Sequence, residues 1–112
     1  MKHRHYAPKG AMTVVEGTDA EKVIKRLTEL YDASENACIL CHTAHLGAFG
    51  GRRVRDLGDT PEKTARVLFA ALREMDEEKI GRILCDGWTE SGVGLAVMNR
   101  MARAAAFDIV RV

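Results

Sequence analysis

Apolar residues in this chain occur in two alternating arrangements: short, mostly apolar runs, and longer stretches in which they recur every three or four positions. The short runs have the length and composition of buried strands. They span residues 12–15, 37–41, 83–85 and 108–112. The longer stretches have the periodicity of amphipathic helices. They span residues 18–34, 60–75 and 93–106. This alternation predicts a three-layer α/β fold with a mostly parallel sheet.

Two sequence signals indicate where helices begin. Thr18 and Glu21 are spaced as a capping box, in which the Thr18 hydroxyl accepts from the Glu21 backbone N–H and the Glu21 carboxylate reaches back. Thr60 followed by Pro61 is typical of an N-cap and a first helical position. Between these helices, residues 42–59 form a glycine-rich connection, in which we predict one short strand at residues 53–57.

Length and composition fit one domain with a short leading segment. The chain has 112 residues, of which 46% are hydrophobic and 29% are charged. This size and balance are typical of a single globular domain with its own core. Residues 1–10 are polar and contain Pro8, so we interpret them as a linker segment and residues 11–112 as a single α/β domain.

The balanced charge and the lack of export signals argue against nucleic-acid and membrane partners and against secretion. Seventeen Lys and Arg residues against sixteen Asp and Glu residues give a net charge of +1, whereas nucleic-acid binders usually carry a clear basic excess. No apolar run approaches the roughly 20 residues needed to span a bilayer. No apolar segment of a secretory signal follows the basic N-terminus. We therefore expect a cytoplasmic protein with no membrane partner and with reduced cysteines.

A cluster of metal-ligand residue types follows the second predicted strand. Cys38, Cys41, His42 and His45 match the pattern C-x-x-C-H-x-x-H, so an independent metal or redox module is one alternative function. However, side chains three positions apart on a strand point to opposite faces of the sheet, so Cys38 and Cys41 should not share a metal. We predict core cysteines beside loop histidines, with no stoichiometric zinc or haem.

A glycine-rich and doubly basic loop is a candidate for anion binding. Gly50, Gly51, Arg52 and Arg53 combine exposed backbone N–H groups with two guanidinium groups, a combination that suits a phosphate. No helix follows at once, so the helix-dipole contribution to a phosphate site is missing. A flexible, solvated loop is the alternative interpretation of this segment.

A second glycine-rich segment, residues 92–94, lies between a predicted strand and a predicted helix. Nucleotide-binding loops occupy this position, which leaves a free-standing nucleotide-binding domain as a further alternative. The third glycine of such a loop would be residue 97, where this chain has Val97. A closely packed turn is therefore the simpler interpretation of Gly92 and Gly94.

The N-terminal segment carries the most unusual set of side chains. Arg4, His5 and Tyr6 place a guanidinium, an imidazole and a phenol on successive residues before Pro8, a combination suited to a phosphate and an aromatic base. The sequence MKHRHYAPKG resembles the linker of long-form, two-domain threonylcarbamoyl-AMP synthases. Residues 64–76 (TARVLFAALREMD) and 92–105 (GVGLAVMNRMARAA) resemble two helices of the small C-terminal domain of that family, in the same order.

The resemblance implies a Rossmann-like accessory domain of an enzyme that joins L-threonine, bicarbonate and ATP into threonylcarbamoyl-AMP for the modification of an adenosine in tRNA. Catalytic residues of that family lie in an N-terminal domain, which would be the partner of this chain. We expect Met1 to follow an upstream catalytic domain, because the linker motif normally continues before this position. The chain alone is not expected to catalyse the reaction.

The resemblance also assigns roles within the linker, which in the family folds over the mouth of the active site. It implies that Arg4 and Tyr6, and more weakly His5, contact ATP or threonylcarbamoyl-AMP. No cofactor is implied for this chain itself, while ATP and Mg²⁺ are implied for the whole enzyme. The balanced net charge of +1 argues against direct tRNA binding by this domain.

Overall fold

A computed structural model describes residues 6–89 and 92–112 of the chain, and its centre is a five-stranded sheet. The strands are β1 (Ala11–Glu16), β2 (Ala37–Cys41), β3 (Val54–Asp56), β4 (Arg82–Asp86) and β5 (Ile109–Arg111). Their order across the sheet is β3-β2-β4-β1-β5, and every pairing is parallel. The predicted α/β fold with a mostly parallel sheet is therefore confirmed.

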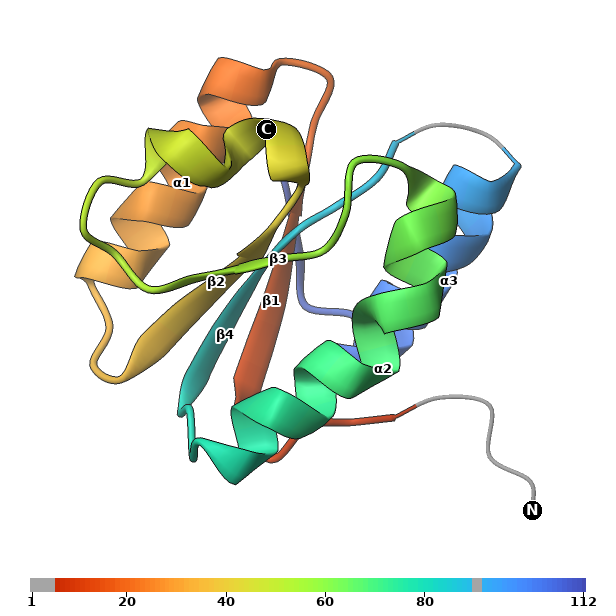
Figure 1. The fold of residues 1–112 in the computed structure, drawn as a ribbon. Coiled ribbons are helices and arrows are strands. Elements are labelled where there is room, and N and C mark those ends of the chain that lie inside the picture. Colours follow the sequence, from red (N-terminus) through yellow and green to blue (C-terminus); the bar gives the residue numbers. More distant parts are fainter. Residues whose placement is uncertain (1–5, 90–91) are drawn as a thin grey trace.

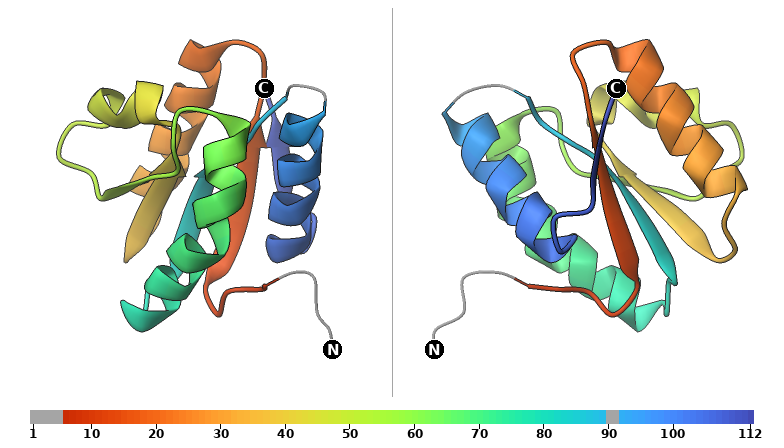
Figure 2. Two further views of the ribbon diagram at one scale, coloured as in Figure 1. Left: turned by 45° about the vertical axis from the view of Figure 1, so that its right-hand side comes forward. Right: turned by 180° about the vertical axis from the view of Figure 1, so that it is seen from behind.

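Helices cover both faces of the sheet and complete three layers (Figures 1 and 2). They are α1 (Ala20–Asp32), the 3₁₀ helix η1 (Thr43–Ala48), α2 (Pro61–Glu77) and α3 (Val93–Ala104). One face packs against α1 and the segment around η1, and the other packs against α2 and α3. The chain crosses the sheet in one direction from β1 through β2 to β3, and in the other direction from β3 to β4 and from β4 to β5. Because the crossovers between parallel strands are right-handed, connections that run in opposite directions lie on opposite faces.

Strand β2 illustrates how the sequence pattern selects this core. All five of its residues are buried, as predicted for a strand covered on both faces. Cys38 and Leu40 join the core beneath α2 and α3, whereas Ile39 and Cys41 join the core beneath α1. Successive side chains alternate between the faces, so the predicted separation of Cys38 from Cys41 is confirmed.

The helix boundaries agree with the sequence signals at α2 and differ at α1. Thr60 caps α2 by accepting from the Lys63 N–H at 3.1 Å, as predicted. At α1 the predicted capping residue Thr18 is wrong, because the N-cap is Asp19, whose carboxylate accepts from the Glu21 N–H at 3.0 Å. An aspartate in this position adds a favourable interaction with the positive end of the helix dipole.

The glycine-rich connection between β2 and α2 is more ordered than its composition indicates. It contains η1, which the sequence analysis did not predict, and β3, which lies within the predicted residues 53–57. Phe49 and Leu57 in this connection are fully buried. Within the described residues, no helix is both long and apolar enough to cross a membrane.

Candidate functional site

Three strands bring polar side chains together at the carboxyl edge of the sheet. β1 and β4 are neighbours, but β1 continues into α1 on one face while β4 leads to α3 on the other (Figure 1). Ligands of open α/β sheets bind in the crevice that such a divergence creates. Here the crevice is lined by Gly17, Thr18, Ala20, Val23, His42, His45, Asp86, Gly87, Trp88 and Thr89.

Asp86, the last residue of β4, is the centre of this crevice. It is 1% exposed, and its Oδ2 accepts from the backbone N–H of His42 at 3.1 Å. The same oxygen lies 2.6 Å from Nδ1 of His45. The second carboxylate oxygen lies 3.5 Å from Nε2 of His42. One nitrogen from each imidazole and a carboxylate oxygen therefore all lie within 4.8 Å of one another.

Aromatic stacking fixes the orientation of the His42 ring. The ring stacks on Trp88 with centroids 3.7 Å apart and an interplanar angle of 15°, and on His45 at 5.1 Å and 23°. Trp88 is itself held, because its indole N–H donates to the Thr64 hydroxyl at 3.1 Å. Thr64 in turn donates to the Leu57 carbonyl at 2.7 Å. A buried chain of contacts thus connects the crevice to α2.

The two imidazoles of the crevice occupy different electrostatic surroundings. Burial lowers the pKa of His42 below its usual value, in spite of the nearby Asp86 carboxylate. The hydrogen bond to Asp86 raises the pKa of His45, which outweighs the opposing effect of its partial burial. The surroundings therefore favour the neutral form of His42 and the protonated form of His45.

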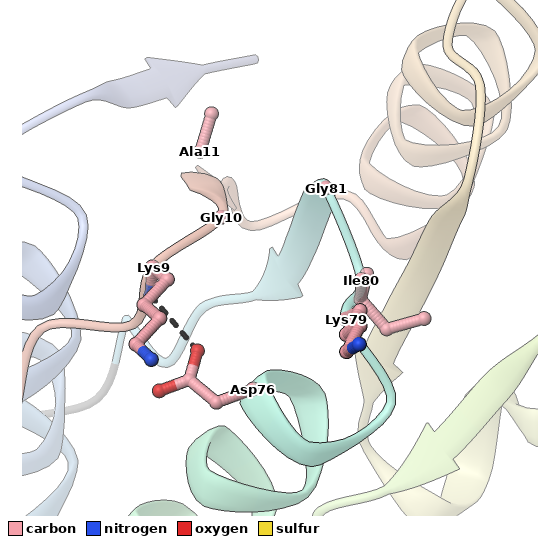
Figure 3. A pocket seen from close by; sticks show the side chains of 7 residues that line it. All are labelled: Lys9, Gly10, Ala11, Asp76, Lys79, Ile80 and Gly81. Carbon is pink, nitrogen blue, oxygen red and sulfur yellow. Dashed lines mark hydrogen bonds between the residues drawn. The ribbon is translucent and has the colours of Figure 1, made fainter.

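The N-terminal segment is attached at the opposite edge of the sheet. The Tyr6 hydroxyl donates to Asp76 Oδ2, and the Lys9 backbone N–H donates to Asp76 Oδ1 at 2.8 Å. Asp76 stands near the end of α2, beside a shallow groove that Lys9, Gly10, Ala11, Lys79, Ile80 and Gly81 also line (Figure 3). Partial burial would raise the pKa of Asp76, but the hydrogen bonds from Tyr6 and Lys9 outweigh it and lower this pKa.

Comparison with known proteins assigns the chain to a family. The family described as threonylcarbamoyl-AMP synthase, C-terminal domain, matches residues 1–106. The chain belongs to this family. It is 41% identical over 112 residues to the threonylcarbamoyl-AMP synthase of Pyrococcus abyssi, and the aligned region covers 100% of this chain and 33% of the relative. It is 31% identical over 113 residues to that of Bacillus subtilis, which covers 99% and 32%.

Solved structures agree with this assignment to the synthase C-terminal domain family. A crystal structure of P. abyssi Sua5 complexed with L-threonine superposes with a TM-score of 0.83 at 40% identity, covering 100% of this chain and 33% of that chain. The C-terminal Sua5 domain from Pyrococcus horikoshii superposes with a TM-score of 0.71 at 32% identity, covering 95% and 100%. The chain thus spans about a third of the curated relatives it matches.

In this member of the synthase family, the cysteines are part of the core. Cys38, Cys41 and Cys85 are free and buried, which confirms the predicted core role. Burial raises the pKa of Cys38 to about 11 and that of Cys41 to about 12. Both are thiols at neutral pH and are poor nucleophiles. Among the described residues, the metal-ligand group comprises His42, His45 and Asp86, so the postulated C-x-x-C-H-x-x-H site is wrong in its cysteines.

The predicted anion loop of this synthase domain has part of its positive charge already paired. Arg52 donates to both carboxylate oxygens of Asp32, each at 2.7 Å, and to the Phe49 carbonyl at 3.1 Å. The backbone N–H of Arg53 donates to the Tyr31 hydroxyl at 3.0 Å. Gly50 has a left-handed φ of 60°, as a tight turn requires. Anion binding by residues 50–53 stays a prediction.

Of the remaining candidate site residues, some lie within the described residues and others do not. Gly92 adopts a left-handed φ of 69° before α3 and is exposed, with open space among the described residues where a side chain would stand, so close packing of the turn is wrong at this position. Gly94 is buried within α3. Tyr6 is described and bonded to Asp76. Arg4 and His5 lie outside the described residues. The sequence-based predictions missed Asp86, although its place at the end of an apolar strand was a usable signal.

Proposed function

We propose that this chain is the accessory domain of a threonylcarbamoyl-AMP synthase, and that its N-terminal linker closes the active site of a catalytic domain. The observation that carries the proposal is the match of residues 1–106 to the C-terminal domain of that family. The whole enzyme would join L-threonine, bicarbonate and ATP, with Mg²⁺, into threonylcarbamoyl-AMP for tRNA modification in the cytoplasm. One similar structure carries L-threonine, which supports that substrate. The chain alone would not be catalytic.

The anchoring of Tyr6 supports a positioned linker. Asp76 accepts hydrogen bonds from Tyr6 and from the Lys9 backbone, so the chain is held at two points before it enters β1 at Ala11. In the proposed enzyme this anchor sets the direction from which residues 1–5 reach the catalytic domain. Arg4 would contact phosphate through its planar guanidinium. Tyr6 would act at the nucleotide through its ring while Asp76 holds its hydroxyl.

In the whole protein, we expect Asp76→Asn to reduce kcat/KM for threonylcarbamoyl-AMP synthesis by roughly tenfold, because it weakens two hydrogen bonds to a charged acceptor. Tyr6→Phe, which removes one of them, should give a smaller loss in the same direction. Threonine-dependent pyrophosphate release measures both effects. Glu77→Gln is the matched control, because it removes the same charge from the neighbouring exposed residue. Equal rates for Asp76→Asn and Glu77→Gln would contradict the anchored linker.

A further inference from the structure

We propose that His42, His45 and Asp86 form a binding site for a divalent transition-metal ion, with Zn²⁺ as the representative ligand. The site lies at the carboxyl edge of the sheet, whereas the anchored linker lies at the opposite edge (Figure 1). The inference is therefore independent of the proposed lid function. It assigns a ligand to the carboxyl edge of the sheet, which plays no part in the proposed closure by the linker.

The geometry of the donor atoms carries this inference. Two imidazole nitrogens and a carboxylate oxygen lie within 4.8 Å of one another. Atoms bound to one tetrahedral zinc stand roughly 3.3 Å apart, given bonds of about 2.0 Å. The 3.5 Å separation of His42 Nε2 from Asp86 Oδ1 already suits this arrangement. His45 Nδ1 lies 2.6 Å from the other carboxylate oxygen, Oδ2, so the ion would bridge the two oxygens or the carboxylate would turn, with a shift of less than about 1 Å at His45.

An unsatisfied nitrogen is the second observation. Nε2 of His42 is buried and has no hydrogen-bond partner among the residues that the structure describes. Leaving a buried polar atom unpaired is costly, so an atom of this kind usually has a function or binds a further group. The stacking of His42 on Trp88 holds this nitrogen close to Asp86. A metal ion at this point would satisfy it.

The lining of the crevice favours a cation over a phosphate or a base. Among the described residues, the lining includes the buried carboxylate of Asp86 and no Lys or Arg. A phosphate would meet that carboxylate without a guanidinium or ammonium to offset it. Trp88 is only 8% exposed, and one face of its ring is covered by His42, so it offers little surface for stacking a base.

The donor types select the kind of cation. Mg²⁺ and Ca²⁺ prefer oxygen ligands, whereas imidazole nitrogens suit zinc and its transition-metal neighbours. Three protein ligands leave at least one coordination position for water or substrate, as in catalytic zinc sites. On binding, Zn²⁺ takes the place of the proton between His45 Nδ1 and Asp86, and that proton is released to solvent. The sequence-based expectation of no zinc rested on the two cysteines and did not consider Asp86.

Zinc binding to the metal-free chain can be measured by isothermal titration calorimetry and by equilibrium dialysis with elemental analysis. We expect about one zinc per chain, and binding at least tenfold weaker in Asp86→Asn and in His42→Ala. The control is the double variant His3→Ala/His5→Ala, which removes the other two of the four histidines and should bind as the wild type does. Near-ultraviolet circular dichroism checks that each variant is folded, and His45→Ala replaces any variant that is not.

Cobalt substitution identifies the ligands. Co²⁺ held by imidazole and carboxylate shows visible d–d bands without the intense thiolate charge-transfer band in the ultraviolet. Several outcomes would overturn the proposal: no binding by the wild type, unchanged binding in folded Asp86→Asn, loss of binding in the His3/His5 control, or a thiolate band. Inorganic phosphate is titrated in parallel, because α1 begins at the rim of the crevice. Saturable phosphate binding in place of zinc would also overturn it.

Discussion

Phe49→Ala is expected to lower the free energy of unfolding by about 3–5 kcal/mol, the usual cost of removing a buried aromatic side chain. Phe49 is fully buried, although it lies in the glycine-rich connection directly after η1. Its ring belongs to the core beneath α1, which also includes Val23, Leu27 and Ile39. The substitution would leave a cavity between the sheet and this connection, because the surrounding strands can collapse only partly.

Urea denaturation of the isolated chain, followed by circular dichroism, measures this loss as a lower midpoint at an unchanged slope. Phe107→Ala is the matched control. It is the same substitution at a residue that is 70% exposed, and it should change stability by less than about 0.5 kcal/mol. If both variants unfold at the same urea concentration, Phe49 does not pack as described and the connection is a solvated loop.

Local sequence signals were sufficient for the strands and the three α-helices of this fold. Strand β2 shows the reason, because a five-residue run that is apolar throughout can be buried on both faces only in a sheet covered on both sides. The alternation of such runs with helical periodicity then determines that the sheet is parallel. The same reasoning correctly separated Cys38 from Cys41, since it depends only on the two-residue repeat of a strand.

The connection between β2 and α2 was harder to predict because its apolar residues have no regular spacing. Phe49 and Leu57 are eight positions apart among glycines and charged residues, and they belong to different cores. Their burial depends on how the connection crosses the edge of the sheet, which is a tertiary property. The sequence could not distinguish Asp19 from Thr18 as the N-cap of α1, because the side chains of both residue types can accept a hydrogen bond from the first turn of a helix.

The crevice was only half predictable for a related reason. His42 and His45 could be identified as candidate metal ligands from the sequence, because they follow two cysteines in a recognisable pattern. Their actual partner, Asp86, is more than forty residues away in sequence. It arrives through the pairing of β2 with β4, which aligns Leu40 with Cys85 and so places the residues that follow next to each other. A search for polar residues at the carboxyl ends of all predicted strands would have included it.

The largest functional effect should come from exchanging the linker. In the synthase proposed for the whole protein, replacing residues 2–8 with a Gly-Ser stretch of equal length should lower kcat/KM by about 100-fold. This expected loss combines the proposed Arg4 contact to phosphate with the proposed Tyr6 contact at the nucleotide, each taken as about 1.4 kcal/mol or tenfold in rate. A closed linker would also keep water away from a labile carbamoyl intermediate. Threonine-dependent pyrophosphate release, measured over a range of ATP concentrations, gives both kcat and KM.

The competing interpretation is that these residues only tether two domains, in which case any flexible sequence of the same length would serve. The exchanged protein separates the two, because it keeps the length of the linker, the Lys9 backbone bond to Asp76 and every fully buried residue of the core. Of the side chains that pack against the core it removes Tyr6. Restoring Arg4 and Tyr6 alone within the Gly-Ser stretch should recover most of the activity. Wild-type turnover and ATP affinity in the fully exchanged protein would show that the linker is a tether, since neither side chain would then be needed for closure.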